Sequence, residues 1–321
     1  MALIVISVIC AILFGRFKIS LSSFFGMMIG NGDYDIEKSV VLRLRLPRTI
    51  IAGLVGASLS VSGLLYQETF RNKLVSPDLL GVSSGAGVGA ASAILLGLPA
   101  FAVSALAFGF GILTVLATGF VARIFKNNSS MTLTLSGIIV GGLAGSVLSF
   151  IKYLADAETT LASITFWLMG SFENATMGDV WMLLPIVLSC LIVALLISYR
   201  INIVALGEEE AKTKGINYKV YKWLIIAIAT LLTAGSVAFA GTISWIGLVI
   251  PHIVRLLVGR NTSKTIPLSI TLGSSFMILS DILCRSFTSA EIPISVITGF
   301  FGTVVFIIIM ATRRNTAYEN D

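Results

Sequence analysis

Ten stretches of the chain are apolar for long enough to cross a lipid bilayer, and no other feature of the sequence restricts its fold as strongly. A membrane-spanning helix needs about 20 mostly apolar residues to traverse the hydrocarbon core. Hydrophobic residues form 56% of the chain and charged residues only 12%, so a soluble fold would lack polar surface to cover its core. We therefore predict an all-α polytopic membrane protein, in which residues 1–321 form one transmembrane domain of about ten helices. The stretches lie near residues 2–15, 48–66, 79–97, 99–122, 133–154, 180–199, 223–241, 243–258, 266–286 and 292–311.

The distribution of lysine and arginine predicts which helix ends face the cytoplasm. If the N-terminus is inside, 14 of the 22 basic residues fall in inside segments and 8 fall outside. Six of those eight precede residue 50, and every later outside segment has almost none. Because cytoplasmic loops collect lysine and arginine, we expect both termini to be cytoplasmic. The basic cluster before residue 50 is the exception and needs its own explanation.

Several chemistries are disfavoured by the sequence. The net charge of +6 resides in the loops of a membrane protein, so we expect no nucleic-acid partner. The chain has no GxxxxGK[ST] loop, so we expect no nucleotide hydrolysis, no cofactor and no enzymatic activity in this subunit. One histidine, His252, and three widely spaced cysteines indicate neither a metal site nor a disulfide. Asp281 is the clearest acidic residue within a span, and we expect it to pair with Arg285 one helical turn later.

The longest polar segment predicted to be cytoplasmic is "YRINIVALGEEEAKTKGINYKVYKW" at 199–223. Residues 208–214 suit a short helix along the membrane face, because Gly207 and Gly215 bound them. One interpretation is a solvated loop, which is what a run of charges usually forms. The other is a docking element for a cytoplasmic partner.

Four stretches together resemble the iron-chelate and vitamin B12 permease family, the membrane subunits of type II ABC importers. They are "LRLPRTIIAGLVGASLSVSGLLYQETFRNKLVSPDLLGVSSGAGVG" (44–89), "FWLMGS" (166–171), "LGEEEAKTKGI" (206–216), and "GTISWIGLVIPHIVRLLVG" (241–259) with "LSDILCRSFTSAEIPISVITGFFG" (279–302). The resemblance implies a ten-helix subunit that pairs with a second copy or a paralogue in a prokaryotic inner or plasma membrane. It also implies a cytoplasmic ATPase dimer, which would bind the ATP, and an extracytoplasmic substrate-binding protein.

The resemblance further assigns roles to individual residues. Arg45, Arg48 and Arg285 are expected to face acidic residues of the binding protein, from external segments near 16–48 and 285–291. A cytoplasmic loop near 200–222 is expected to couple to the ATPase through Gly207, Glu208, Glu209, Ala211 and Gly215. A cytoplasmic gate is expected at Asn72, Ser130, Met131 and Leu135. Two positions depart from the family pattern, because Lys73 and Val304 stand where the family often has proline.

Two classes of function follow from these observations. The first is a permease of an ATP-driven importer for a metal chelate, with a ferric siderophore as the leading cargo and cobalamin or haem as alternatives. The second is a secondary transporter driven by an ion gradient, which would need acidic residues near the membrane midplane. The sequence does not identify the cargo, because no aromatic box or cluster of metal ligands marks it. The polar loop and the missing nucleotide loop favour the first class.

Overall fold

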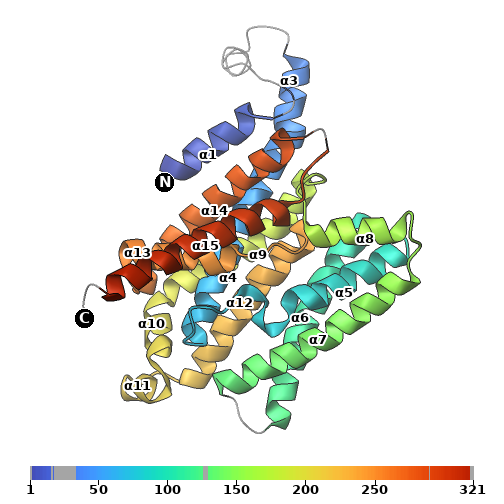
Figure 1. Cartoon of the computed structure of the whole chain (residues 1–321). Coiled ribbons are helices and arrows are strands. Elements are labelled where there is room, and N and C mark those ends of the chain that lie inside the picture. The colour runs from blue at the N-terminus through green and yellow to red at the C-terminus, as the bar shows by residue number, and fades with distance from the viewer. Residues whose placement is uncertain (1, 16, 18–33, 126–128, 289, 319–321) are drawn as a thin grey trace.

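The computed structural model describes the chain except for residues 1, 16, 18–33, 126–128, 289 and 319–321, and the regular structure of the described part is entirely helical (Figure 1). The first half contains α1 (Ala2–Leu13), α3 (Asp35–Ser39), the π-helical turn η1 (Val40–Arg45), α4 (Leu46–Thr69), the 3-10 turn η2 (Pro77–Leu80), α5 (Val82–Leu95), α6 (Ala100–Ile124) and α7 (Ser130–Leu154). The second half contains α8 (Thr160–Met169), α9 (Met177–Leu196), α10 (Ser198–Leu206), α11 (Glu208–Thr213), α12 (Tyr218–Ala240), α13 (Ile246–Val258), α14 (Thr262–Ser286) and α15 (Ile294–Tyr318).

Each of the ten predicted spans coincides with a helix, which confirms the all-α membrane fold. In the described part of the chain, six helical segments are long and apolar enough to cross a bilayer: residues 35–69, α6, α7, α9, α12 and α14. The other four spans correspond to α1, α5, α13 and α15. Three of these are shorter than predicted, because α1 has 12 residues, α5 has 14 and α13 has 13. At about 1.5 Å per residue, helices of this length cover about 20 Å, less than the hydrocarbon core.

The shortening of α5 and α13 has a local cause in the backbone. Gly81, immediately before α5, has φ of 78°, and Trp245, immediately before α13, has φ of 73°. Positive φ is compatible with glycine but ends a right-handed helix. The segments that precede α5 and α13 therefore enter the bundle as turns rather than as continuous helix. Non-helical backbone is tolerated at membrane depth where protein or a water-filled cavity surrounds it.

Helix α4 runs through the middle of the bundle, with α9, α12 and α14 around it (Figure 1). Its small residues allow neighbouring backbones to approach closely. A Cβ atom on Gly63 would lie 1.8 Å from the carbonyl oxygen of Gly247, and one on Gly56 would lie 2.2 Å from that of Gly273. Such contact supplies packing energy between helices that the hydrophobic effect cannot supply in lipid.

Serine hydroxyls add hydrogen bonds between α4 and its neighbours. Ser60 donates to the carbonyl of Ser269 at 2.8 Å, and Ser62 donates to that of Ala229 at 2.8 Å. The periphery is different, since α6 and α7 are largely exposed in the single chain. Helix α4 therefore forms the centre of the bundle, and the neighbouring helices pack around it.

Candidate sites for docking, coupling and translocation

A buried cluster of charges joins the start of α4 to the end of α14. Nε of Arg48 donates to Oδ1 of Asp281 at 2.8 Å, and its two terminal nitrogens bind the two oxygens of Glu291 at 2.7 and 2.9 Å. Asp281 also lies 3.6 Å from Nε of Arg285, as the spacing of one helical turn predicts. The prediction for Asp281 was incomplete, because its closer partner is Arg48 and its side chain is only 1% exposed. Since Glu291 lies between α14 and α15, Arg48 ties this connection to α4.

Arg45 and Arg285 bind the C-terminal end of α1. Arg285 donates to the carbonyl of Ala11 at 2.5 Å, and Arg45 donates to the carbonyls of Leu13 at 3.1 Å and of Ile12. The last carbonyls of a helix lack partners within the helix and attract cations. The two guanidinium groups therefore hold α1, a peripheral helix, against the body of the protein.

The three predicted docking arginines are brought together, but not as an exposed patch. Arg45, Arg48 and Arg285 are 4%, 8% and 6% exposed, and their partners lie within this chain. The sequence could not show this, because the carboxylate partners of Arg48 are more than 230 residues away. Their role in docking remains a prediction, and it requires that a partner's carboxylates compete with internal ones.

The predicted coupling segment forms two short helices, α10 and α11, joined at Gly207. Gly207 has φ of 126°, and Gly215 after α11 has φ of 69°, so glycine is needed at both ends of α11. Ala211 is fully buried and fixes α11 to the body, whereas the Glu209 side chain is 85% exposed. The predicted short helix is confirmed, and it presents one anchored face and one charged face.

Electrostatic contacts stabilise α11. Lys212 lies 3.2 Å from Glu208 and 3.3 Å from Glu209, and the hydrogen bonds that it donates to Glu208 and Glu209 raise the pKa of Lys212. The acidic residues stand in the first turn of α11, where the helix dipole favours them. The guanidinium of Arg71, in the turn after α4, approaches Gly207. This contact links the coupling segment to the inner end of the central helix.

The predicted gate residues lie on two elements. Asn72 is in the turn after α4, where its Oδ1 accepts a hydrogen bond from the Leu74 amide at 3.0 Å. Ser130 is the first residue of α7, and Met131 and Leu135 follow on that helix, 74% and 50% exposed. Asn72 accepts within its own turn, and the carbonyl of Ser130 accepts from Thr134 within α7, so the gate stays a prediction.

A polar cavity of about 390 Å³ lies between the two interrupted segments. Its lining includes Asp78 of η2, the serines that begin α5, Thr233 of α12, and residues 242–245. Oδ1 of Asp78 accepts a hydrogen bond from the Ser83 amide at 2.8 Å and so caps α5. The sequence signals for this cavity were Pro77, which lies between predicted spans, and Gly241, which ends one, but the stretches 79–97 and 243–258 were expected to be helical throughout.

Trp245 forms one wall of this polar cavity and has an unusual backbone. Its φ is 73°, a left-handed value that is strained for a bulky residue. A Cβ atom on Gly302 of α15 would lie 2.5 Å from Cβ of Trp245, and the Trp245 ring packs on Phe306 at 6.2 Å between centroids. The polar cavity is therefore in direct contact with α15.

At the inner end of the bundle, Arg255 of α13 binds Glu68 of α4 at 3.0 Å. Gln67 next to it donates to the carbonyls of Val75 at 3.1 Å and Gly247 at 3.2 Å. Through these contacts, the end of α4 holds both the turn that follows it and the start of α13. Both segments that interrupt the spans are thus anchored to α4.

Membrane permease subunits are typically polytopic helical bundles with interrupted spans. They also carry a short polar helix at the cytoplasmic end, as α11 does in this chain. The chain belongs to the FecCD transport family, whose model matches residues 3–312. It is therefore a multi-pass membrane protein and an ABC transporter permease.

Curated relatives of this family are named for different cargoes. The molybdate import system permease protein MolB of Haemophilus influenzae is 36% identical, over 95% of this chain and 91% of the relative. The "Probable iron chelatin transport system permease protein" of Helicobacter pylori strain 26695 is 33% identical, over 97% and 96%. The vitamin B12 import system permease protein BtuC of Klebsiella pneumoniae is 34% identical, over 85% and 83%.

A solved structure described as an inward-facing conformation of a metal-chelate type ABC transporter matches with a TM-score of 0.88. The match has 34% sequence identity and covers 97% of both chains. The family, the fold and the resemblance identified from the sequence are thereby confirmed. The names of the relatives leave the cargo of this chain open.

Proposed function

We propose that this chain is the membrane subunit of an ATP-driven importer that moves a metal chelate into the cytoplasm of a prokaryote by alternating access. A ferric siderophore is the leading cargo, with cobalamin and haem as alternatives. The observation that carries the proposal is α11, a charged helix mounted on a permease-family bundle by the fully buried Ala211. A permease without its own ATPase needs such an element to receive mechanical work from a partner.

The partner on the inner face is a dimer of ABC ATPase subunits, which bind and hydrolyse ATP. In this proposal α11 sits in a cleft of the ATPase, and closure of the ATPase dimer displaces it. Gly207 and Gly215 act as flexible joints on either side, while Arg71 passes the displacement to the end of α4. Rigid-body motion of packed helices then changes which side of the membrane the pathway faces.

A second permease copy or a paralogue completes the pathway. Two helices of the single chain expose several large apolar side chains, among them Met131, Leu135 and Leu143 on α7 and Phe300 and Ile307 on α15. Membrane lipid can cover such faces, and so can another permease. A pathway between two copies places Met131 and Leu135 at its cytoplasmic end, where they act as the gate with Ser130 and Asn72.

An extracytoplasmic binding protein delivers the cargo at the outer ends of α4 and α14. Arg45, Arg48 and Arg285 provide three positive charges there against the two negative charges of Asp281 and Glu291. The remaining positive charge favours an acidic partner and speeds its approach. We infer that docking draws Arg48 away from Glu291 toward a carboxylate of the binding protein.

Transport by the reconstituted system tests the proposal. Liposomes that contain this chain, the candidate ATPase and the binding protein should accumulate the chelate only when ATP is supplied to the ATPase side. Molybdate belongs in the panel of cargoes, since MolB of Haemophilus influenzae is 36% identical. Uptake by this chain alone along an imposed cation gradient would contradict the proposal and support a secondary transporter.

A further inference from the structure

A cavity of about 610 Å³ lies at the outer ends of five helices, apart from the polar cavity at Trp245. Its walls come from the C-terminal ends of α5 and α12, the N-terminal ends of α6 and α9, and α8. By the distribution of basic residues, all of these ends face the outside. Neither the predicted docking arginines nor the predicted gate residues line this cavity.

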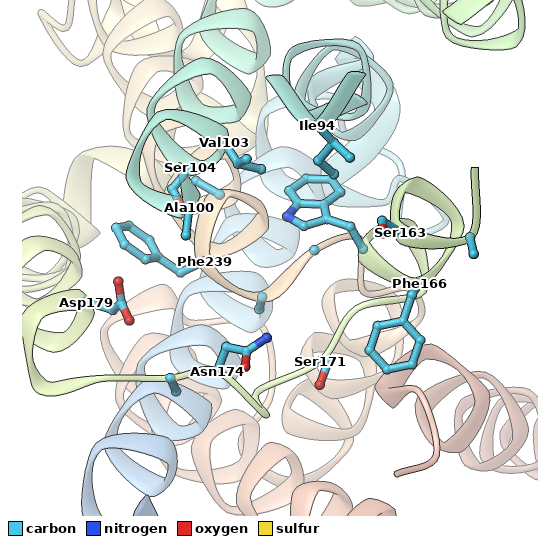
Figure 2. A pocket seen from close by; sticks show the side chains of 16 residues that line it. Ile94, Ala100, Val103, Ser104, Ser163, Phe166, Ser171, Asn174, Asp179 and Phe239 are labelled. Carbon is cyan, nitrogen blue, oxygen red and sulfur yellow. The ribbon is translucent and has the colours of Figure 1, made fainter. Parts of the chain in front are cut away.

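The cavity is apolar at its floor and polar at its mouth. Buried Val103 and Ala238 form part of the floor, whereas Ser163 and Asn174 at the mouth are exposed. Figure 2 shows Asp179 and Phe239 on one side of the cavity, and Ser163 and Phe166 on the opposite side. A ligand with one polar end and an apolar body fits this gradient, and the volume falls within the usual range of small-molecule sites.

Asp179 is the one charged residue among the described residues that line the cavity. Its carboxylate is held in place by Thr176, whose amide and hydroxyl donate to Oδ2 at 2.8 and 2.7 Å. These bonds form a capping box at the start of α9 and restrict the rotamer of the side chain. The cavity therefore contains a negative charge in a fixed position, although the chain as a whole carries a net charge of +6.

A carboxylate and aromatic rings that line one cavity provide the chemistry that recognises organic ammonium groups. Phe166, Trp167 and Phe239 line the cavity together with Asp179. Aromatic faces attract quaternary or primary ammonium groups, and the carboxylate adds an opposite charge. A bare metal ion fits less well, because hard cations take several oxygen ligands and the described residues contain no group of three or more acidic, histidine or cysteine side chains placed to hold one.

We propose that this outer cavity binds an amphiphilic organic ammonium compound, with the ammonium group beside Asp179 and the apolar body against Phe239, Val103 and Ile94. Two sources carry this chemistry. One is a zwitterionic phospholipid of the outer leaflet, whose ammonium headgroup would lie at the mouth. The other is a soluble organic ammonium compound that enters from the external medium. The proposal does not depend on which chelate the permease transports.

The lipid arm of the test uses the full chain in nanodiscs that contain equal amounts of phosphatidylethanolamine and phosphatidylglycerol. Native mass spectrometry then measures which lipid stays bound. The soluble arm uses nanodiscs of phosphatidylglycerol alone and titrates phenyltrimethylammonium, with quenching of tryptophan fluorescence as the signal. Trp167 lines the cavity, so a Trp167→Phe variant should lose most of the ligand-dependent quenching.

The decisive variant is Asp179→Asn. Its side-chain oxygen can still accept the hydrogen bonds from Thr176, so the cap of α9 is retained while the charge is removed. We expect binding to weaken about five- to tenfold, the size of one partly desolvated charge contact. Glu173→Gln is the matched control, since Glu173 is an exposed carboxylate in the same loop that does not line the cavity.

The outcomes separate the sources and can overturn the proposal. Selective retention of phosphatidylethanolamine that Asp179→Asn abolishes supports a lipid ligand. Saturable binding of phenyltrimethylammonium without lipid selectivity supports a soluble ligand. If neither probe binds, or if Asp179→Asn and Glu173→Gln bind alike, the proposal is overturned. Transport by the reconstituted importer is measured separately, so failure here leaves the proposed function intact.

Discussion

The guanidinium of Arg48, near the start of α4, lies 2.7 Å from the carboxylate of Asp281 in α14, and both side chains are almost fully buried. The pair crosses 233 positions of the sequence. Its second carboxylate, Glu291, lies in the connection to α15. A single arginine therefore sets the relative position of the central helix, α14 and the beginning of α15.

We predict that Asp281→Ala strongly destabilises the protein. Removing one partner of a buried ion pair leaves the other charge without compensation, at a cost of about 3–5 kcal/mol. Replacing both partners, in Arg48→Met with Asp281→Leu, should recover part of that loss. Thermal unfolding in detergent measures each variant. Equal melting temperatures for Asp281→Ala and the unchanged protein would show that the pair contributes nothing to stability.

Glu291→Gln should tighten docking of the binding protein, about three- to tenfold. The substitution removes an internal competitor for Arg48, whose side chain then has a free charge to offer. Binding to the immobilised permease gives the affinity, and salt dependence shows whether charge carries it. Glu173→Gln removes a carboxylate elsewhere on the outer side and should leave docking unchanged. Weaker docking of Glu291→Gln would mean that Glu291 assists the partner instead.

Arg48 and Arg285 are too deeply buried for their reversal to glutamate to affect docking alone. Two new carboxylates would lie against Asp281 in a buried site, so the abundance of the variant should fall together with docking. Western blotting of membranes checks this expectation. Normal abundance would indicate that the charge cluster opens readily in the membrane.

Glu209→Lys should reduce ATP-dependent uptake without changing the stability of the permease. The Glu209 side chain is 85% exposed on α11, so its contact with Lys212 contributes little to stability, whereas the face presented to the ATPase changes its charge. Uptake by the reconstituted importer should fall at least about tenfold if this contact resembles an interfacial charge pair. Glu173→Gln on the opposite side of the membrane serves again as the control. Full uptake by Glu209→Lys would show that this face of α11 does not contact the ATPase.

Gly63→Ala should prevent normal assembly of the bundle. The new methyl group would lie 1.8 Å from the carbonyl oxygen of Gly247, so α4 and α13 would have to separate. Overpacking of this kind costs about 1–3 kcal/mol or more. Gly109→Ala in α6 is the matched control, because no atom lies within 4 Å of the added carbon. Membrane abundance and melting temperature should fall for the first variant only.

The sequence predicted the helices well and their interruptions poorly. Apolar runs at 99–122, 133–154 and 266–286 became α6, α7 and α14, because a segment in lipid must satisfy its own backbone hydrogen bonds. The runs at 79–97 and 243–258 gave shorter helices, since Gly81 and Trp245, the residues before α5 and α13, adopt positive φ. Hydropathy does not distinguish an apolar turn from a helix, so the sequence did not predict the polar cavity at Trp245.

Helix α11 could be predicted from the sequence because its signals are local. Gly207, three glutamates and Gly215 lie within nine consecutive positions, and α11 formed between the two glycines. The outer arginines could be recognised as a group, yet their burial could not. The sequence also did not predict a site at Asp179. A single carboxylate after an ordinary turn does not indicate a site, and only the packing of α5, α6 and α12 forms the cavity that Asp179 lines.

By itself, the sequence determined that this protein crosses the membrane about ten times, belongs with the iron-chelate and vitamin B12 permeases, and forms a short charged helix between two glycines. Those properties depend on segment length, composition and neighbouring residues, which a linear chain displays directly. The tertiary structure alone decided that Arg48 binds Asp281 and Glu291, and that Asp179 faces an aromatic cavity. Such contacts join residues from distant helices, and only the packing of those helices brings the charges within bonding distance.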